Sequence, residues 1–112
     1  MAETFKRGGS TLASTSATVL YTAPSAAGDV AILLSCHVAN KTNSAANVTV
    51  EVADSGGTAQ TCLLYTAGVP ANTSMEIVQN KVVLMAGEKL TATADTADVF
   101  SITVSALDIT SA

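Results

Sequence analysis

The clearest indication of the fold class is the stretch AILLSCHVANKTNSAANVTVEVAD, residues 31–54. Residues 46–54 alternate, with Val48, Val50 and Val52 on one face, and this period of two is typical of a half-buried β-strand. Residues 30–40 form a longer, more apolar segment of the same kind, and the polar residues 41–45 form a loop between the two. The stretch therefore predicts two consecutive strands.

The rest of the chain repeats this arrangement, with short apolar segments separated by turn residues. Two antiparallel sheets packed face to face bury so many strands economically. The sequence predicts an all-β protein, a single antiparallel β-sandwich of jelly-roll-like or Ig-like type with eight or nine short strands. Besides the two strands above, we expect strands at 17–24, 59–67, 75–78, 82–86, 90–95 and 98–110, with a further short one at 3–7.

The N-terminal segment, residues 1–16, is the part that we expect to stand apart from the core. Residues 3–7 predict a short strand or an arm, and the small polar residues 8–16 predict a flexible connection. The segment is either an extended arm that reaches a neighbouring subunit or a disordered tail. Residues 17–112 form the predicted sandwich domain.

Charged residues are sparse. They make up 12% of the 112 residues, against about 25% in a typical soluble domain, whereas hydrophobic residues make up 48%. A surface with so little charge suggests that much of it is covered in an assembly. The net charge of −4 and the absence of a basic stripe exclude a nucleic-acid-binding protein.

No segment has the length of apolar sequence that spans a membrane, so we expect no membrane association. The N-terminus lacks the apolar core of a secretory signal, so we expect folding in a cytosol.

Cys36 and His37 are adjacent, which raises the hypothesis of a thiolate nucleophile with its base. Neighbouring side chains on a strand point to opposite faces, so the two cannot come within hydrogen-bond reach. We expect Cys36 in the core, His37 on the other face and no metal between them. The predicted core row is Ile32, Leu34, Cys36 and Val38, and the predicted outer row is Ala31, Leu33, Ser35 and His37.

Other signs of chemistry are also missing. Cys36, Cys62 and His37 are the only nitrogen or sulfur ligands, too few for a structural zinc site. Asp95 and Asp98 flank a turn without the pattern of a calcium loop. There is no phosphate-binding loop and no nucleophile elbow. We predict no catalytic, cofactor or metal site and no enzyme activity, and whether Cys36 and Cys62 form a disulfide stays open.

The C-terminal strand changes its pattern along its length. Phe100, Ile102, Val104 and Ala106 share one face, after which the apolar residues switch to the other face. The switch needs either a bulge or a strand that is covered on both faces. The candidate subunit-interface residues are therefore Phe5, Leu33, His37, Leu107 and Ile109.

Several stretches, taken in order, resemble small virion structural proteins of tailed bacteriophages. They are ATVLYTAP (17–24), a strand that ends in VAN (38–40), the loop AGVPANTS (67–74), the turn LMAGEKL (84–90) and the closing strand VSALDIT (104–110). The likeness runs from Val19 to Thr110, and Glu88 stands where aspartate is usual. The resemblance brings no functional residues with it.

The resemblance implies a non-enzymatic β-sandwich subunit of a virion, assembled in the host cytoplasm. A capsid decoration or cement protein is the leading interpretation, and a neck or tail accessory subunit is the alternative. We expect a homo-oligomer, a trimer or larger ring, that contacts the major capsid protein or a neck or tail protein. A module of another class, which binds a receptor or glycan through the loops at 41–45, 69–74 and 95–98, is also open.

Overall fold

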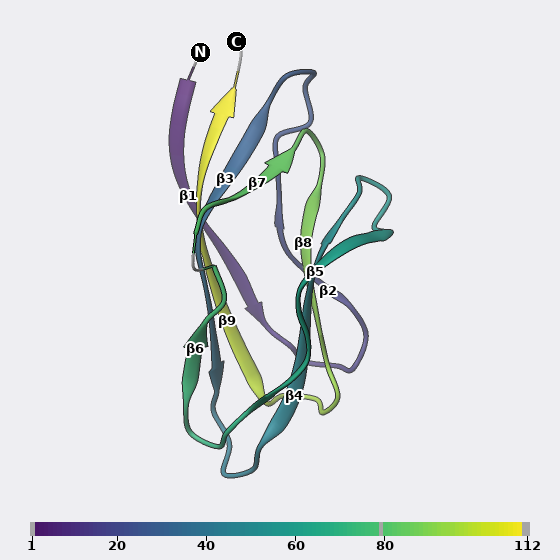
Figure 1. Ribbon diagram of the computed structural model, residues 1–112, viewed down its shortest axis with the longest axis vertical. Helices are drawn as coiled ribbons and strands as arrows, with labels where there is room; N and C mark the ends of the chain where they lie inside the picture. Colours follow the sequence, from purple (N-terminus) through teal and green to yellow (C-terminus); the bar gives the residue numbers. More distant parts are fainter. Residues whose placement is uncertain (1, 79, 111–112) are drawn as a thin grey trace.

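The protein is a β-sandwich of two antiparallel sheets (Figure 1). The computed structural model describes residues 2–78 and 80–110. Nine strands lie in these ranges, so the predicted fold class is confirmed. They are β1 (Ala2–Thr11), β2 (Thr18–Thr22), β3 (Val30–Asn40), β4 (Ala46–Ala53), β5 (Ala59–Val69), β6 (Ser74–Glu76), β7 (Val82–Met85), β8 (Lys89–Ala94) and β9 (Phe100–Thr110).

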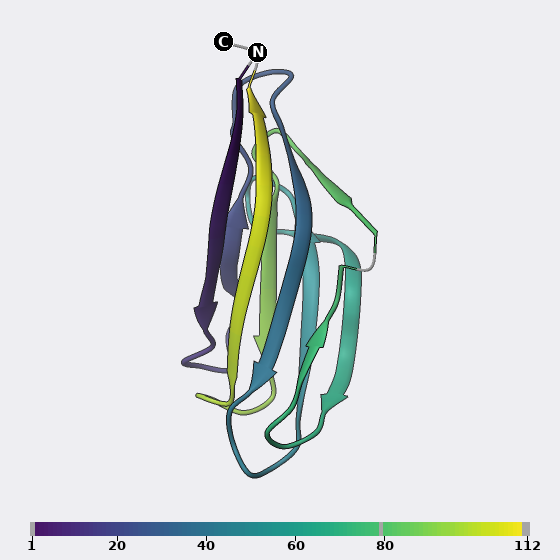
Figure 2. The same ribbon diagram turned by 90° about the vertical axis from the view of Figure 1, so that its left-hand side faces the viewer.

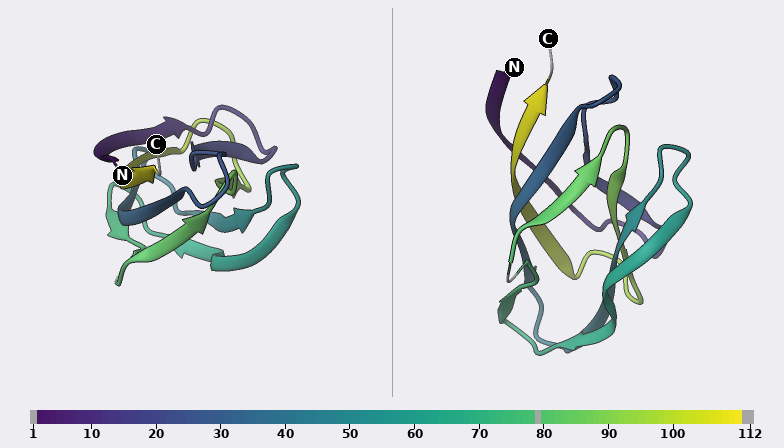
Figure 3. Two further views of the ribbon diagram at one scale, coloured as in Figure 1. Left: turned by 90° about the horizontal axis from the view of Figure 1, so that it is seen from above. Right: turned by 45° about the horizontal axis from the view of Figure 1, so that its top comes forward.

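The strand order is that of a jelly roll. Sheet A has the order β1-β9-β3-β6, and β7 pairs with the other half of β3. Sheet B has the order β2-β8-β4-β5. Successive strands alternate between the sheets through most of the chain, and the two layers curve round a common interior when seen from above (Figure 3). No helix in the described part of the chain has the length and apolar character to cross a bilayer.

The core lies between the sheets and consists mainly of aliphatic side chains. Phe100 is its one fully buried aromatic residue among those described. The alternating valines of β4 point inward, as the sequence predicts. The largest fully buried side chains are those of Phe100, Leu12, Leu33, Leu84, Leu90, Val38, Val48, Val50, Val69, Val104 and Cys36.

The N-terminal segment is not a separate arm within the described residues. Residues 2–11 form β1, which pairs with β9 at ten consecutive positions, from Ala2–Thr110 to Thr11–Ser101. The prediction of a detached segment is therefore wrong for these residues, and residue 1 lies outside the described range. The close approach depends on Gly9, because a Cβ there would lie 2.0 Å from the carbonyl oxygen of Ile102.

A β-bulge in β3 overturns the predicted core row of that strand. Leu33 pairs with Ala106 and Ser35 pairs with Ser105, so Leu34 is an extra residue opposite β9. The extra residue reverses the alternation, and Leu33 is therefore buried at 0% exposure instead of lying on the outer face. The inward row is Ala31, Leu33, Cys36 and Val38, whereas Ile32 is half-buried.

Strand β9 itself keeps one alternation along its whole length. Phe100, Ile102, Val104 and Ala106 are buried, as predicted, and the pairing with β1 has no register shift. Leu107 and Ile109 follow on the outer face, where both are half-buried. The irregularity that the sequence places in this strand therefore lies in its partner β3.

Candidate interaction surfaces

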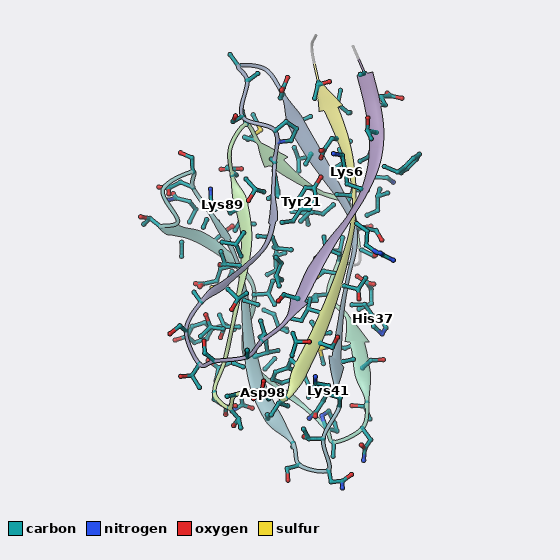
Figure 4. The ribbon with its side chains drawn as sticks, turned by 180° about the vertical axis from the view of Figure 1, so that it is seen from behind. Lys6, Tyr21, His37, Lys41, Lys89 and Asp98 are labelled. Carbon is teal, nitrogen blue, oxygen red and sulfur yellow. The ribbon has the colours of Figure 1, made fainter. Side chains whose placement is uncertain are left out.

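Cys36 and His37 lie on opposite faces of β3, as predicted. Cys36 is buried at 0% exposure, and His37 is exposed and points away from the sandwich (Figure 4). Burial, and secondarily the charge of Glu76, raises the pKa of the Cys36 thiol from 9.0 to about 12. A thiol with this pKa is neutral near pH 7, and the thiolate is the nucleophilic form. The pair therefore has neither the geometry nor the ionisation of a reaction centre.

Cys62 lies on a different sheet, so the question of a disulfide is answered. Both thiols are free, Cys36 within sheet A and Cys62 exposed on β5 of sheet B. The Cys62 thiol donates to Oε2 of Glu51 at 3.4 Å. Its pKa is raised by desolvation and by the hydrogen bond and charge of Glu51.

The described residues hold no group of three histidine, cysteine, aspartate or glutamate side chains arranged for a metal ion. Asp95, at the turn considered for calcium, accepts a hydrogen bond from the backbone N–H of Asn47 at 3.0 Å and another from the Thr96 hydroxyl. This carboxylate therefore has structural partners at the turn.

The loops considered for ligand binding gather at one end of the sandwich (Figure 1). The backbone N–H of Asn72 donates to the carbonyl of Thr42 at 3.0 Å, which joins two of these loops. A shallow depression of about 150 Å³ lies on sheet B and has no aromatic side chain in its lining. Its lining residues are Asn47, Thr49, Thr66, Thr93, Ala94 and Asp95.

Tyr21 and Asp108 join the two sheets near the opposite end. The Tyr21 hydroxyl donates to the Asp108 carboxylate, and the pKa of Tyr21 is raised by partial burial and then by this carboxylate. Gly8 of β1 makes room for the ring, because a Cβ at Gly8 would lie 2.9 Å from a Tyr21 ring carbon. The contact is a structural tie between β2 and β9.

Apolar side chains form two rows across the outer face of sheet A. Phe5 pairs with Leu107, Leu107 with Ile32, and Ile32 with Val83. Residues paired directly in a sheet point to the same face, so these four side chains lie side by side. Their strands are neighbours in the order β1, β9, β3 and β7 (Figure 2). The second row is Ile109, Val30 and Met85. We call these seven residues the outer apolar face.

The outer apolar face is unusually open to solvent. Phe5 is 76% exposed, Met85 58% and Val83 51%, whereas the other four members are half-buried. Contiguous apolar patches of this kind mark interaction surfaces on soluble proteins. The surface below it on sheet A is polar, with Ser105, Thr103 and Ser101 on β9.

Known proteins share the fold of this chain but show no family for it. No protein-family model matches the chain, and no curated protein sequence matches it. Among solved structures, the chain is similar to one from the Bacillus endospore appendages, which are described as a novel family of disulfide-linked pili. The TM-score is 0.55 at 14% identity, and the match covers 99% of this chain and 87% of the other. At that identity the likeness shows a shared fold.

Four of the five predicted interface residues lie on the outer side of sheet A, and the structure places three of them in one patch. Phe5, Leu107 and Ile109 belong to the outer apolar face, and His37 lies farther along β3. Leu33 is in the core. Val30, Ile32, Val83 and Met85 were not among the predicted interface residues. The bulge at Leu34 reverses the faces of the β3 residues that precede it. If the bulge had been predicted, Val30 and Ile32 would have been assigned to the outer face.

Proposed function

We propose that this chain is a non-enzymatic structural subunit that acts by packing against other protein chains. The outer apolar face is the observation that carries the proposal. Its side chains come from four strands, and three of them are more than half exposed. Removal of such a face from water favours association, because burial of apolar surface is the main favourable contribution in most protein–protein contacts.

The composition supports the same function. Only 12% of the residues are charged, which leaves few charges to keep copies of the chain apart. The solved structure of similar fold comes from appendages described as disulfide-linked pili. The shared fold makes a structural role physically reasonable, because a sandwich offers broad faces and strand edges to neighbours.

We further propose a setting for this function, a tailed-phage virion in which the chain is a capsid decoration protein. The proposal rests on the resemblance of the stretches at 17–24, 38–40, 67–74, 84–90 and 104–110. A neck or tail accessory subunit has the same support and is the alternative. Contacts with a major capsid protein or with a tail protein would then cover the outer apolar face.

Two measurements together test the structural function. Sedimentation velocity at micromolar concentrations should show association, and a variant with Val83→Thr and Met85→Thr should associate less. Mass spectrometry of purified particles should find the chain among the particle proteins. A monomer at every concentration, combined with absence from the particles, would end the proposal.

A further inference from the structure

We infer that β1 pairs with β1 of a second copy of this chain, in antiparallel orientation about a two-fold axis at Phe5. The inference rests on the proposed structural function and names one contact by which the subunit assembles. It joins the two A sheets edge to edge into one continuous sheet. The observations that carry it are the regularity of the β1 edge, its exposure and the order of its charges.

Four edges bound the two sheets, and three of them are poor templates for another strand. Strands β6 and β7 share one edge and have three and four residues. Strand β2 has five residues and a register shift. Strand β5 is long, but its pairing with β4 has three register shifts, and Thr66 has a positive φ of 46°. Bulges twist an edge away from the flat geometry that strand addition needs.

Strand β1 has the opposite character. It pairs with β9 at ten consecutive positions without a shift, so its backbone presents a regular ladder. Its residues are exposed throughout, except for Gly8, which is half-buried against β2. Figure 2 shows β1 as the outermost strand of sheet A, and no described strand is hydrogen-bonded to its free edge.

The charged residues of β1 have opposite signs at equal distances on the two sides of Phe5, with Glu3 before it and Arg7 after it. Glu3, Phe5 and Arg7 alternate along the strand and point to the outer face, opposite Ile109, Leu107 and Ser105 of β9. An antiparallel pair centred on Phe5 places Glu3 opposite Arg7 of the second copy and Arg7 opposite Glu3. Opposite charges paired directly across strands stabilise a sheet, and a two-fold axis makes the contact twice.

The remaining positions of residues 2–8 are compatible with this register. Thr4 lies opposite Lys6 of the second copy, and Ala2 lies opposite Gly8, so no like charges meet. A centre at Lys6 would instead place Lys6 opposite Lys6 and separate Glu3 from Arg7. The order of charges therefore favours the register centred on Phe5 over the one centred on Lys6.

The same register joins the outer apolar faces of the two copies. Phe5 meets Phe5 at the axis, and the row through Leu107, Ile32 and Val83 continues on both sides. Aromatic pairs are among the favourable cross-strand contacts. The two-fold contact closes a dimer, so a trimer or larger ring requires a second kind of contact.

Cysteine cross-linking tests the register directly. In a Cys62→Ser background, Phe5→Cys should form an interchain disulfide under mild oxidation, because the two side chains are directly opposed. The matched controls Thr4→Cys and Lys6→Cys should not, because each lies diagonally from its own copy. Equal cross-linking of all three variants, or none by Phe5→Cys, overturns the inference.

Charge exchange tests the same contact without a new thiol. Glu3→Arg or Arg7→Glu alone places like charges opposite each other twice, and each should raise the dimer dissociation constant roughly tenfold. The double variant restores the pairs and should return the constant to within about twofold of the wild type. Circular dichroism confirms the fold of each variant. Single variants that associate like the wild type, or a double variant that stays weak, contradict the inference.

The outcomes separate this inference from the proposed function. If the chain associates but the β1 cross-link does not form and charge exchange has no effect, the proposed structural function stands and the β1 contact is wrong. If the chain is a monomer at every concentration, the β1 contact is wrong. Mass spectrometry of the particles then tests the proposed structural function.

Discussion

The carboxylate of Glu76 accepts the hydrogen bond from the backbone N–H of Cys36, in place of a carbonyl group of a neighbouring strand. Glu76 Oε2 lies 2.6 Å from the backbone nitrogen of Cys36, at the point where the edge partner of β3 changes from β6 to β7. The same oxygen accepts the N–H of Val78 at 3.0 Å, and Ile77 donates to the Cys36 carbonyl. One side chain thus satisfies the backbone beside the bulge.

Removal of this carboxylate should destabilise the fold. Glu76→Ala leaves the N–H groups of Cys36 and Val78 without their acceptor, and the free energy of unfolding should fall by about 1–2 kcal/mol. Urea denaturation measures this change. Glu51→Ala is a suitable control, since the described contact of Glu51 is with the Cys62 thiol, and it should change stability by less than about 0.5 kcal/mol. Equal effects of the two variants would contradict this role for Glu76.

The Cys36 thiol should make the protein less stable at alkaline pH. Its pKa is about 12 in the fold, against 9.0 for an ordinary thiol. Below about pH 9 both states hold the proton, and the full stability is present. Above that pH the unfolded chain releases its proton first, so the free energy of unfolding falls by up to about 1.4 kcal/mol per pH unit.

The variant Cys36→Ala should flatten this dependence. Urea denaturation between about pH 8 and pH 11 measures the slope. Tyr21, whose pKa is also raised, acts in the same direction, so the slope should decrease without disappearing. A slope equal to that of the wild type would show that the fold does not raise the pKa of the Cys36 thiol.

Gly9 tests the attachment of β1 to the sandwich. A Cβ at Gly9 would lie 2.0 Å from the Ile102 carbonyl oxygen, and its φ of 119° is rare for other residues. Gly9→Ala should therefore cost about 1–3 kcal/mol in thermal or urea denaturation. In contrast, a Cβ at Gly56 meets one side-chain oxygen at 3.4 Å, so Gly56→Ala is the milder control. A neutral Gly9→Ala would indicate that residues 2–11 are a free arm.

The two phenylalanines should differ in their contribution to stability, because one lies in the core and the other on the surface. Phe100 is fully buried, and Phe100→Ala should cost about 3–5 kcal/mol through lost burial and the cavity left behind. Phe5 is 76% exposed, and Phe5→Ala should change the stability of the monomer by less than about 1 kcal/mol. Denaturation at low protein concentration measures both values. Comparable losses would mean that Phe5 belongs to the core.

The sequence predicts the strands better than it predicts their faces. Alternation in β4 is clear, because one face is apolar and the other polar, and the structure confirms it. In β3 both rows are apolar, since the inward row fills the core and Ile32 joins the outer apolar face. A bulge is invisible in such a strand, so the face of Leu33 could not be predicted correctly.

The full length of the N-terminal strand and the contacts of Glu76 were not predicted, for different physical reasons. The polar and glycine-rich sequence of β1 has no apolar alternation, because its stability comes from pairing with β9. Glu76 accepts from the backbone N–H of Cys36, forty positions away, and no local pattern predicts such a contact. Cys36 and His37 needed only the local alternation after the bulge, so their opposite faces were predicted correctly.

Electron cryo-microscopy of the native assembly that contains this chain would show directly whether the outer apolar face is an interface between subunits. We expect that protein covers the outer apolar face, with Phe5, Val83 and Met85 buried against a neighbouring chain. An assembly in which this face is open to solvent in every copy would show that the outer apolar face is not an interface.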